Sequence, residues 1–384
     1  MEEGKTYRLE DLTIDGKGHY GIGAPAVDFD ENKFTYLRIT DINDDGSINY
    51  SGLKSVDDPE AGKYLLKEGD IVFARTGNST GRSYYYEPSD GQFVFAGFLI
   101  KFSLDPVKVN PRYLKYYTHS QAYYEWVKSF DTGATRGNIN AQTYGAMEIS
   151  LPPRTVQDRL VEVLSSIDDK IKLNNRINHN LEEQADCLIS SAIETQSIGS
   201  AHLWDICSYV TERVNNDTLN NKNYISTDNM FANKGGIGIA STIPDGKCTS
   251  FKVRDVLVSN IRPYFKKIWR ASFSGGCSND VLCFRTTKGT SSFLYHLLRS
   301  DVFFDYVMSG AKGSKMPRGD KQHIMNWTIP VFEKAIIISL EDSLEVIDDR
   351  VAIIQEENRR LSAIRDSLLP MLMTNSIYIN DLTC

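Results

Sequence analysis

The sequence predicts an α+β protein in which two similar mixed α/β domains are separated by two long helices paired as an antiparallel coiled coil, with pseudo-twofold symmetry. Three observations predict this fold class: 384 residues exceed one ordinary domain, the two halves repeat one another, and each repeat ends in a heptad pattern. We therefore divide the chain into a globular domain (1–153), a central helical spacer (154–196), a second globular domain (197–331) and a C-terminal helical spacer (332–384).

The repeat consists of five pairs of matching segments in the same order in both halves. They are GDIVFARTG (69–77) with RDVLVSNIR (254–262), 113–127 with 293–307, 133–140 with 313–320, 149–152 with 327–330, and IDDKI (167–171) with IDDRV (347–351). The second and fifth pairs share one constant offset along the chain. A repeat of this length indicates that a globular domain and the helix after it were duplicated together.

Both helical segments carry a seam of apolar or Asn residues spaced alternately by four and three positions, which is typical of a coiled coil. In the first segment the seam includes Leu160, Leu164, Ile167, Ile171, Asn174, Asn178, Leu181 and Leu188. In the second it includes Leu344, Ile347, Val351, Asn358, Leu361 and Leu368. Forty helical residues span roughly 60 Å, which suits a spacer.

A stripe this narrow is buried only against another narrow stripe, so we expect the two helices to pair with each other. Because each domain precedes its own helix, antiparallel pairing would place the domains at opposite ends. Asn174, Asn178 and Asn358 are then expected to fix the register, since a buried amide at a seam costs stability but selects one alignment. The alternative is that each helix packs only on its own domain.

The net charge of −7 conceals an asymmetry between the domains. Residues 1–150 hold 16 Lys and Arg against 22 Asp and Glu, whereas residues 201–332 hold 17 against 10. Phosphate binding relies on Lys and Arg, so the second domain has the charge expected of a nucleic-acid binder and the first does not.

Composition and motifs exclude several classes of function. The longest aliphatic run, near 335–340, is too short to cross a membrane, and the six cysteines show no zinc spacing, so we expect a reduced, cytoplasmic protein without a metal. The stretch 76–83 resembles a phosphate loop but has Arg82 where a lysine is required. No motif of a methyltransferase, protease or esterase is present, so we expect no catalytic residue.

Two polar regions of each repeat are candidates for DNA contacts, because Arg and Lys bind phosphates or guanine and Asn reads adenine. In the first repeat they contain Arg75, Thr76, Asn78, Ser79, Thr80, Arg82, Thr135, Arg136, Asn138 and Asn140. In the second they contain Asn260, Arg262, Lys266, Lys267, Arg270, Lys312, Lys315, Arg318 and Lys321. The alternative interpretation is that these are ordinary solvated loops, with 264–270 forming a strand that buries its aromatic residues. The tyrosines at 84–86, 116, 117, 123 and 124 are expected in the core.

The combination of GDIVFARTG, GATRGNIN (133–140), an apolar residue followed by Pro, and IDDKI before a heptad helix resembles the specificity subunit of type I restriction-modification enzymes. The terminal LLPMLM (368–373) is also similar to that family, and the resemblance covers almost the whole chain. The second repeat departs from the pattern at Arg254, at 259–262 and at 315–318.

The resemblance implies a non-catalytic subunit with two target recognition domains, each reading one half of a bipartite site in double-stranded DNA. It also implies that the helices set the spacer between the half-sites and dock two methyltransferase subunits. Those partners would use S-adenosylmethionine, and motor-nuclease restriction subunits would use ATP and Mg²⁺. Two other functions stay open: a coiled-coil adaptor that binds proteins, and the detached recognition part of a single-chain restriction-methylase.

Overall fold

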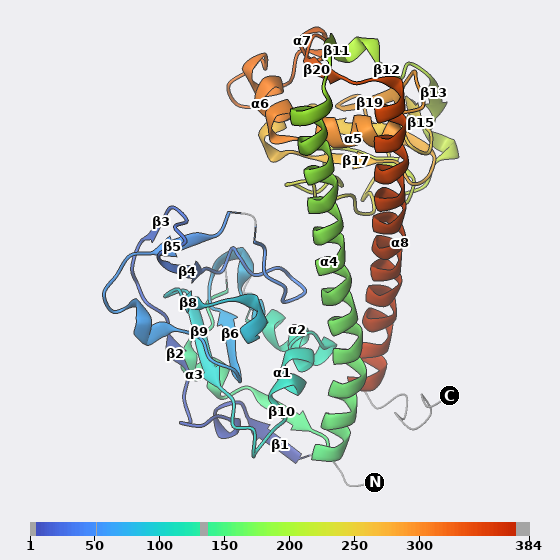
Figure 1. The fold of residues 1–384 in the computed structure, drawn as a ribbon. Coiled ribbons are helices and arrows are strands. Elements are labelled where there is room, and N and C mark those ends of the chain that lie inside the picture. The colour runs from blue at the N-terminus through green and yellow to red at the C-terminus, as the bar shows by residue number, and fades with distance from the viewer. Residues whose placement is uncertain (1–4, 51, 131–136, 374–384) are drawn as a thin grey trace. The chain divides into compact units, whose positions relative to one another are not determined.

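A computed structural model describes residues 5–50, 52–130 and 137–373 of the chain (Figure 1). The chain forms two compact units: the first contains Met1–Ile171 and Arg359–Cys384, and the second contains Lys172–Asn358. Each unit therefore combines one globular domain with one stretch of each long helix. No helix within the described ranges is both long and apolar enough to cross a membrane.

Within the described residues, the globular part of the first unit contains two four-stranded sheets and one strand pair. The sheets have the strand orders β2-β9-β6-β7 and β3-β5-β4-β8, and β1 pairs antiparallel with β10. The strands are β1 Lys5–Arg8, β2 His19–Tyr20, β3 Ala26–Val27, β4 Phe34–Leu37, β5 Lys54–Val56, β6 Asp70–Ala74, β7 Ser83–Tyr85, β8 Phe93–Phe95, β9 Leu99–Ser103 and β10 Glu148–Leu151. The central strand β6 is buried throughout, as its continuous apolar sequence predicts.

Short helices complete this globular part. The α-helices are α1 Pro111–Tyr117, α2 Gln121–Lys128 and α3 Ala141–Gly145, and the 3-10 helices are η1 Glu10–Leu12, η2 Ala61–Tyr64, η3 Gly77–Ser79 and η4 Pro88–Asp90. The α-helices begin at Asn110, Ser120 and Asn140, whose side chains each accept a hydrogen bond from a backbone N–H of the first turn. Most of the tyrosines predicted to lie in the core are buried, but Tyr124 is 48% exposed.

The second unit repeats this architecture. Its sheets have the strand orders β12-β19-β16-β17 and β13-β15-β18-β14, and β11 pairs antiparallel with β20. The strands are β11 Gly199–His202, β12 Cys207–Tyr209, β13 Arg213–Asn215, β14 Tyr224–Ile225, β15 Lys247–Phe251, β16 Val256–Ser259, β17 Ile268–Arg270, β18 Gly275–Cys277, β19 Val281–Thr286 and β20 Thr328–Val331. The helices are α5 Ser291–Arg299, α6 Asp301–Ser309, α7 Lys321–Met325, η5 Leu203–Asp205, η6 Asn216–Thr218 and η7 Pro263–Phe265.

The turn before the central strand confirms the alignment of the two repeats. Asp70 and Asp255 are each 2% exposed, and each accepts a hydrogen bond from the backbone N–H of the lysine three positions earlier, at 2.9 Å in the first unit and 2.7 Å in the second. The preceding residue has a positive φ in both units, +89° at Gly69 and +75° at Arg254. The second repeat therefore keeps the backbone of this turn without its glycine.

The two long helices, α4 (Arg154–Gln196) and α8 (Lys334–Met373), pair antiparallel in each unit (Figure 1). In the first unit, one buried cluster includes Leu160 and Leu164 of α4 and Leu372 of α8, and Asp168 forms an ion pair with Arg365 at 3.2 Å. In the second unit, Asn174 contacts Asn358. Increasing residue numbers on α4 meet decreasing numbers on α8, so the predicted antiparallel pairing is confirmed.

The helices also pack on the globular domains, which was the alternative to pairing. In the second unit, Ala185 and Ile189 of α4 and Leu344 of α8 belong to the same cluster as Phe293 and Phe304 of the domain. The helices therefore pair with each other and complete the domain cores at the same time.

One seam position is wrong: Leu188 is 39% exposed, whereas its neighbour Ile189 is 7% exposed. The buried residues here are Ala185, Ile189 and Ala192. The strict heptad shifts because this part of α4 is buried against the domain, and an undistorted α-helix has a period of about 3.6. The other described seam positions are buried or half-buried.

A layer of side-chain amides lies in the part of the helix pair that belongs to the second unit. The Asn174 Nδ2 group donates to the Asn358 side-chain oxygen at 2.8 Å and to Glu357 at 2.9 Å. The Asn358 Nδ2 group donates in turn to the Asn175 side-chain oxygen at 2.8 Å. Sliding one helix along the other would break these bonds and leave the buried Asn174 amide unpaired, so the layer selects one register, as Asn174 and Asn358 predicted. Asn178, the third seam asparagine, is buried outside this layer, and its side-chain oxygen has no hydrogen-bond partner among the described residues.

We predict that Arg254→Gly stabilises the protein. A non-glycine residue in the left-handed region costs about 1–2 kcal/mol, and the ion pair that Arg254 makes with Glu345 is partly exposed and contributes little. The free energy of unfolding, measured by urea denaturation, should increase by about 1 kcal/mol.

Gly69→Ala is the matched control and should lower the free energy of unfolding by a similar amount. A Cβ at position 69 would meet its nearest atom at 3.6 Å, which is an ordinary contact, so only the backbone conformation is tested. Equal stabilities of both variants and the parent chain would contradict the explanation.

Candidate nucleic-acid interface

In the first unit, the two polar regions that the sequence proposed for DNA contacts lie next to each other. The segment after β6 forms a bridge between Thr76 and Asn138, and the Ile139 N–H donates to the Arg75 carbonyl oxygen at 3.0 Å. Arg75 itself donates through its backbone N–H to the Phe98 carbonyl oxygen at 3.1 Å. Two segments that lie far apart in the sequence therefore form one polar surface at the end of the central strand.

The side chains of this surface differ in exposure and in the hydrogen bonds that they make. Asn78 and Asn138 are exposed, whereas Ser79 is 7% exposed. The Thr80 hydroxyl lies 2.8 Å from the carbonyl oxygens of Gly77 and Gly137 and so ties the two segments together.

Two further candidates are engaged in other contacts. Arg82 forms an ion pair with Asp44 at 2.6 Å, and Asn140 caps α3 through its bond with the Thr143 N–H. Thr135 and Arg136 lie outside the described residues.

Arg75 differs from Arg82 in its surroundings. The guanidinium carbon of Arg75 lies 5.1 Å from the centre of the Tyr20 ring, and the Tyr20 hydroxyl accepts a hydrogen bond from the Ala141 N–H at 3.1 Å. Tyr20 thus links β2 to the start of α3 and positions the Arg75 side chain through a cation–π contact. The sequence did not indicate Tyr20, because it lies on another strand, far from Arg75 along the chain.

The second unit brings its two candidate regions together in the same way. Bridges join Arg318 to Ile261 and to Lys312, and the Arg262 N–H donates to the Pro317 carbonyl oxygen at 2.8 Å. The segment after β16 therefore lies beside the segment after α6, as the segment after β6 lies beside the segment after α2. The repeated sequence pattern thus corresponds to a repeated surface.

The cations of the second surface are mostly paired but accessible. Lys312 is 82% exposed and pairs with Asp320 at 2.7 Å, and Arg318 is 56% exposed and pairs with Asp280 at 3.1 Å. Hydrogen bonds from the Lys312 ammonium group and from two backbone N–H groups lower the pKa of Asp320 to about 2, so this carboxylate stays ionised. Exposed pairs of this kind contribute little to stability, so a phosphate could replace the carboxylate at low cost.

Three other lysines are candidates from the same two polar regions of the second repeat. Lys315 is exposed, Lys321 lies 5.9 Å from the centre of the Tyr209 ring, and Lys266 pairs with Asp301 at 3.1 Å. Lys267 instead donates to the Thr227 carbonyl oxygen at 2.7 Å, and burial lowers the pKa of its ammonium group.

Arg270 lies in a different environment from the other candidates. Its side chain is 10% exposed on β17, and the guanidinium faces Asp348 at 3.6 Å and Asp349 at 3.9 Å. The neighbouring Trp269 is 6% exposed, as the alternative interpretation expected, but Tyr264 and Phe265 are 47% and 37% exposed and lie in η7, before the strand. The position of Arg270 favours a structural role, in which it holds the domain to α8.

Asp168 and Asp348, at equivalent positions of the repeated IDD motif, join each domain to a long helix. Asp168 on α4 accepts from the Lys115 ammonium group at 2.9 Å and from the Tyr116 hydroxyl at 3.0 Å. Asp348 on α8 bonds His296 at 3.0 Å, and His296 is the residue that aligns with Tyr116 in the repeat. Sequence reasoning noted the repeated motif without assigning it a role, although an Asp repeated beside a seam residue is a signal for such a contact.

The pKa values of these groups agree with their geometry. Burial alone would raise the pKa of Asp168, but Lys115, Arg365 and the Tyr116 hydroxyl outweigh it and lower the pKa below 3.8. Burial alone would lower the pKa of His296, but the carboxylates of Asp186, 3.9 Å away, and Asp348, 3.0 Å away, outweigh it, and the pKa is raised. Attraction between opposite charges therefore strengthens both the contact of Asp168 with Lys115 and the contact of Asp348 with His296.

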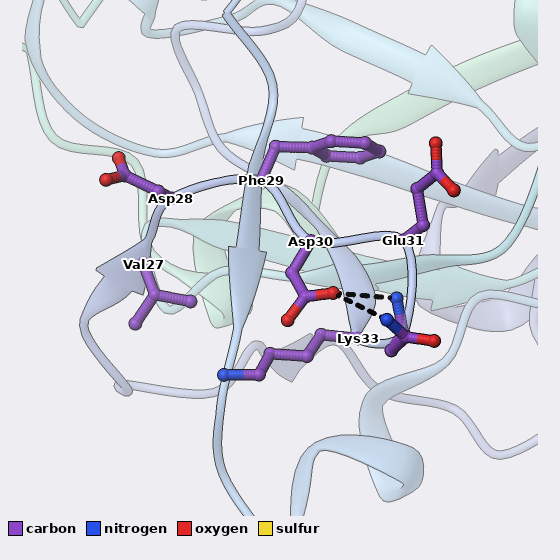
Figure 2. A pocket seen from close by; sticks show the side chains of 7 residues that line it. Val27, Asp28, Phe29, Asp30, Glu31 and Lys33 are labelled. Atoms are coloured by element: carbon purple, nitrogen blue, oxygen red, sulfur yellow. Dashed lines mark hydrogen bonds between the residues drawn. The ribbon is translucent and has the colours of Figure 1, made fainter.

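An acidic loop in the first unit is distinct from the candidate surface. Figure 2 shows a shallow hollow formed by residues 27–33, in which Asp30 accepts hydrogen bonds from the backbone and side-chain nitrogens of Asn32. The lysines close to it are neutralised, since Lys33 pairs with Asp57 and Lys54 pairs with Asp28. This negative surface is unsuited to a phosphate backbone. Among the described residues, no cluster of His, Cys, Asp and Glu is arranged to hold a metal.

Comparison with known proteins finds one family that matches the first domain and the start of α4. Residues 1–183 match the family described as "Type I restriction modification DNA specificity domain". The first part of the chain is thus similar to the DNA specificity domain of type I restriction-modification systems. Among its relatives are the HindI specificity subunit of Haemophilus influenzae, 23% identical over 200 residues, and the StySPI specificity subunit of Salmonella potsdam, 29% identical over 156 residues. These alignments cover 50% and 38% of this chain, and they span 41% and 34% of the relatives' length.

A solved structure of the type I S subunit from M. genitalium has the same fold. The match covers 96% of this chain and 95% of that chain, with a TM-score of 0.54 and 15% sequence identity. At this identity the likeness concerns the fold alone. It agrees with the two β-rich domains and the packed helices α4 and α8 described above.

We predict that Asp168→Asn weakens the attachment of the first domain to α4. Asp168 is 11% exposed at its side chain and neutralises Lys115 and Arg365, so its loss should lower the free energy of unfolding by about 3 kcal/mol at neutral pH. The difference from the parent chain should shrink as the pH falls through the lowered pKa of Asp168, because the parent then loses the same charge. Chemical denaturation at several pH values measures both effects.

Asp169→Asn serves as the control, since Asp169 is exposed on the next position of the same helix. It should change stability by less than about 0.5 kcal/mol. Equal effects of the two substitutions, or a pH-independent effect of Asp168→Asn, would contradict the anchoring role.

Proposed function

We propose that this chain is the DNA-reading subunit of a type I restriction-modification complex. In this proposal, residues 1–153 and 197–331 are target recognition domains that each read one half of a bipartite site in double-stranded DNA. Residues 154–196 and 332–384 set the spacer between the half-sites and dock two methyltransferase subunits. The chain supplies sequence recognition and a scaffold, and chemistry belongs to its partners.

The observation that carries this proposal is the repeated surface at the end of the central strand. In both units a segment after that strand meets a segment after the second short helix, through the Thr76–Asn138 bridge in one and the Ile261–Arg318 bridge in the other. Both surfaces hold donors of the kinds that read base edges and bind phosphates. Two similar surfaces on one chain suit a site with two halves. The match of residues 1–183 to a DNA specificity domain supports the same conclusion and disfavours an adaptor that binds only proteins.

The partners and cofactors follow from the family and remain part of the proposal. The methyltransferase subunits would use S-adenosylmethionine to methylate adenine, and restriction subunits would use ATP and Mg²⁺ to cleave unmodified DNA. The proposal also keeps the cytoplasmic location expected from the sequence.

We predict weak, salt-sensitive DNA binding by the chain alone and tight, specific binding when the methyltransferase is present. The first domain is acidic, and three of its arginines, Arg8, Arg38 and Arg82, are paired with carboxylates, so few cations are available for phosphates. A gel-shift assay with and without the partner, at about 50 and 200 mM salt, tests this. Equally tight specific binding by the lone chain would contradict the dependence on a partner, and the absence of specific binding by the complex would contradict the proposed function.

We also predict that lengthening both helices by one heptad changes the spacer and not the half-sites. One added heptad lengthens a helix by about 10 Å, equivalent to roughly three base pairs. Insertions beside the amide layer, after Arg176 in α4 and before Glu356 in α8, would preserve the seam. Mapping of methylated DNA should show unchanged half-sites with a longer gap, or no methylation.

A four-residue insertion in both helices is the control, because it breaks the heptad pattern and should abolish methylation. Altered half-site sequences in the heptad variant would count against the spacer role of the helices.

A further inference from the structure

Arg75 and Asn260 occupy the same backbone position in the two domains. The Arg75 N–H donates to the carbonyl oxygen of Phe98, just before β9, and the Asn260 N–H donates to that of Asp280, just before β19. The carbonyl oxygens of Arg75 and Asn260 accept from Ile139 and Gly319, which align with each other in the repeat. Arg75 and Asn260 therefore make equivalent pairs of backbone hydrogen bonds, which shows that they occupy corresponding positions in the two domains.

Both side chains hold a buried polar atom that has no partner among the described residues. The Arg75 Nε and the Asn260 Oδ1 are buried without a hydrogen bond. In the second unit, Asn229, which is also buried, bonds through both polar atoms of its amide. Buried polar groups are normally paired, because an unpaired one loses its water without compensation. Two unpaired groups at one repeated position indicate a ligand that is absent from the free chain.

The chemistry of the two side chains points to base edges. The fork of an Arg guanidinium matches the O6 and N7 atoms of guanine, and an Asn carboxamide matches the N6 and N7 atoms of adenine. The Tyr20 ring at 5.1 Å holds the Arg75 guanidinium from one side, which reduces the entropy lost when a base is bound. In the acidic first domain, an arginine without an ion pair among the described residues is available for this role.

We propose that Arg75 and Asn260 are corresponding base-reading residues, so that Arg75 requires a guanine in one half-site and Asn260 requires an adenine in the other. The inference rests on the proposed function and adds which residues carry specificity. Asn260 is 9% exposed, and its Oδ1 lies against Gly319. Reading of adenine therefore requires the 312–319 segment to move when its cations meet the phosphates.

The test uses the full chain in complex with its methyltransferase and a DNA library in which both half-sites are randomised, with methylation read by single-molecule sequencing. The parent complex should give a bipartite motif with a guanine in one half and an adenine in the other. Arg75→Ala should reduce discrimination at one guanine by about ten- to a hundred-fold and leave the other half-site unchanged. Asn260→Ala should do the same at one adenine of the other half-site.

Arg8→Ala and Asn215→Ala are matched controls, because Arg8 pairs with Glu10 and Asn215 bonds Asp217 away from these surfaces, and they should leave the motif intact. If an alanine variant has a lower melting temperature than the parent chain, Arg75→Gln or Asn260→Asp, which preserve size and polarity, is used in its place. Each should reduce discrimination at the same base as the alanine variant. Unchanged discrimination, or a loss spread evenly over all positions, would overturn the inference while the proposed function stands. A parent complex that gives no bipartite motif would overturn the proposed function itself.

Discussion

A buried carboxylate on a long helix fixes each globular domain, and the rest of the structure depends on it. Asp168 and Asp348 are 11% and 8% exposed at their side chains, and each meets a donor from the first short helix of its domain. Removing one of these partners would leave a buried charge uncompensated, so each contact favours one position of the domain on its helix. This contact then fixes where the proposed DNA-contact surface lies relative to the helix stretch of the same unit.

A similar constraint applies to the proposed DNA-contact surfaces at the end of the central strand. A strand that is buried along its length cannot move without disturbing the core. The backbone of the residues that directly follow it is therefore held in place. Arg75 and Asn260 are the first residues beyond β6 and β16. More distant loop residues, such as Asn78 and Lys315, are exposed and can adapt to the phosphate backbone. Rigid positions therefore suit base recognition, and adaptable ones suit phosphate contacts.

Much of the fold could be predicted from the sequence, because repetition and heptad spacing are local patterns. The duplicated domains, the two long helices and their antiparallel pairing were predicted, whereas Leu188 was wrong because burial against a domain outweighed the heptad. The sequence indicated which loops carry donors but not which donors are free: Arg82 is paired with Asp44 and Arg270 faces α8. Contacts such as Tyr20 with Arg75 join residues on different strands, and no spacing rule connects them. The DNA contacts themselves stay a prediction.

The core of the first unit has a further consequence for how the chain is made. Its buried cluster includes Leu369 and Leu372 of α8 together with Leu160 and Leu164 of α4 and residues of the first domain. During synthesis the first domain leaves the ribosome early, but the part of α8 that covers its apolar surface is translated only after the whole second domain. The domain made first is thus the last to be completed, and until then its uncovered leucines are a natural target for chaperones.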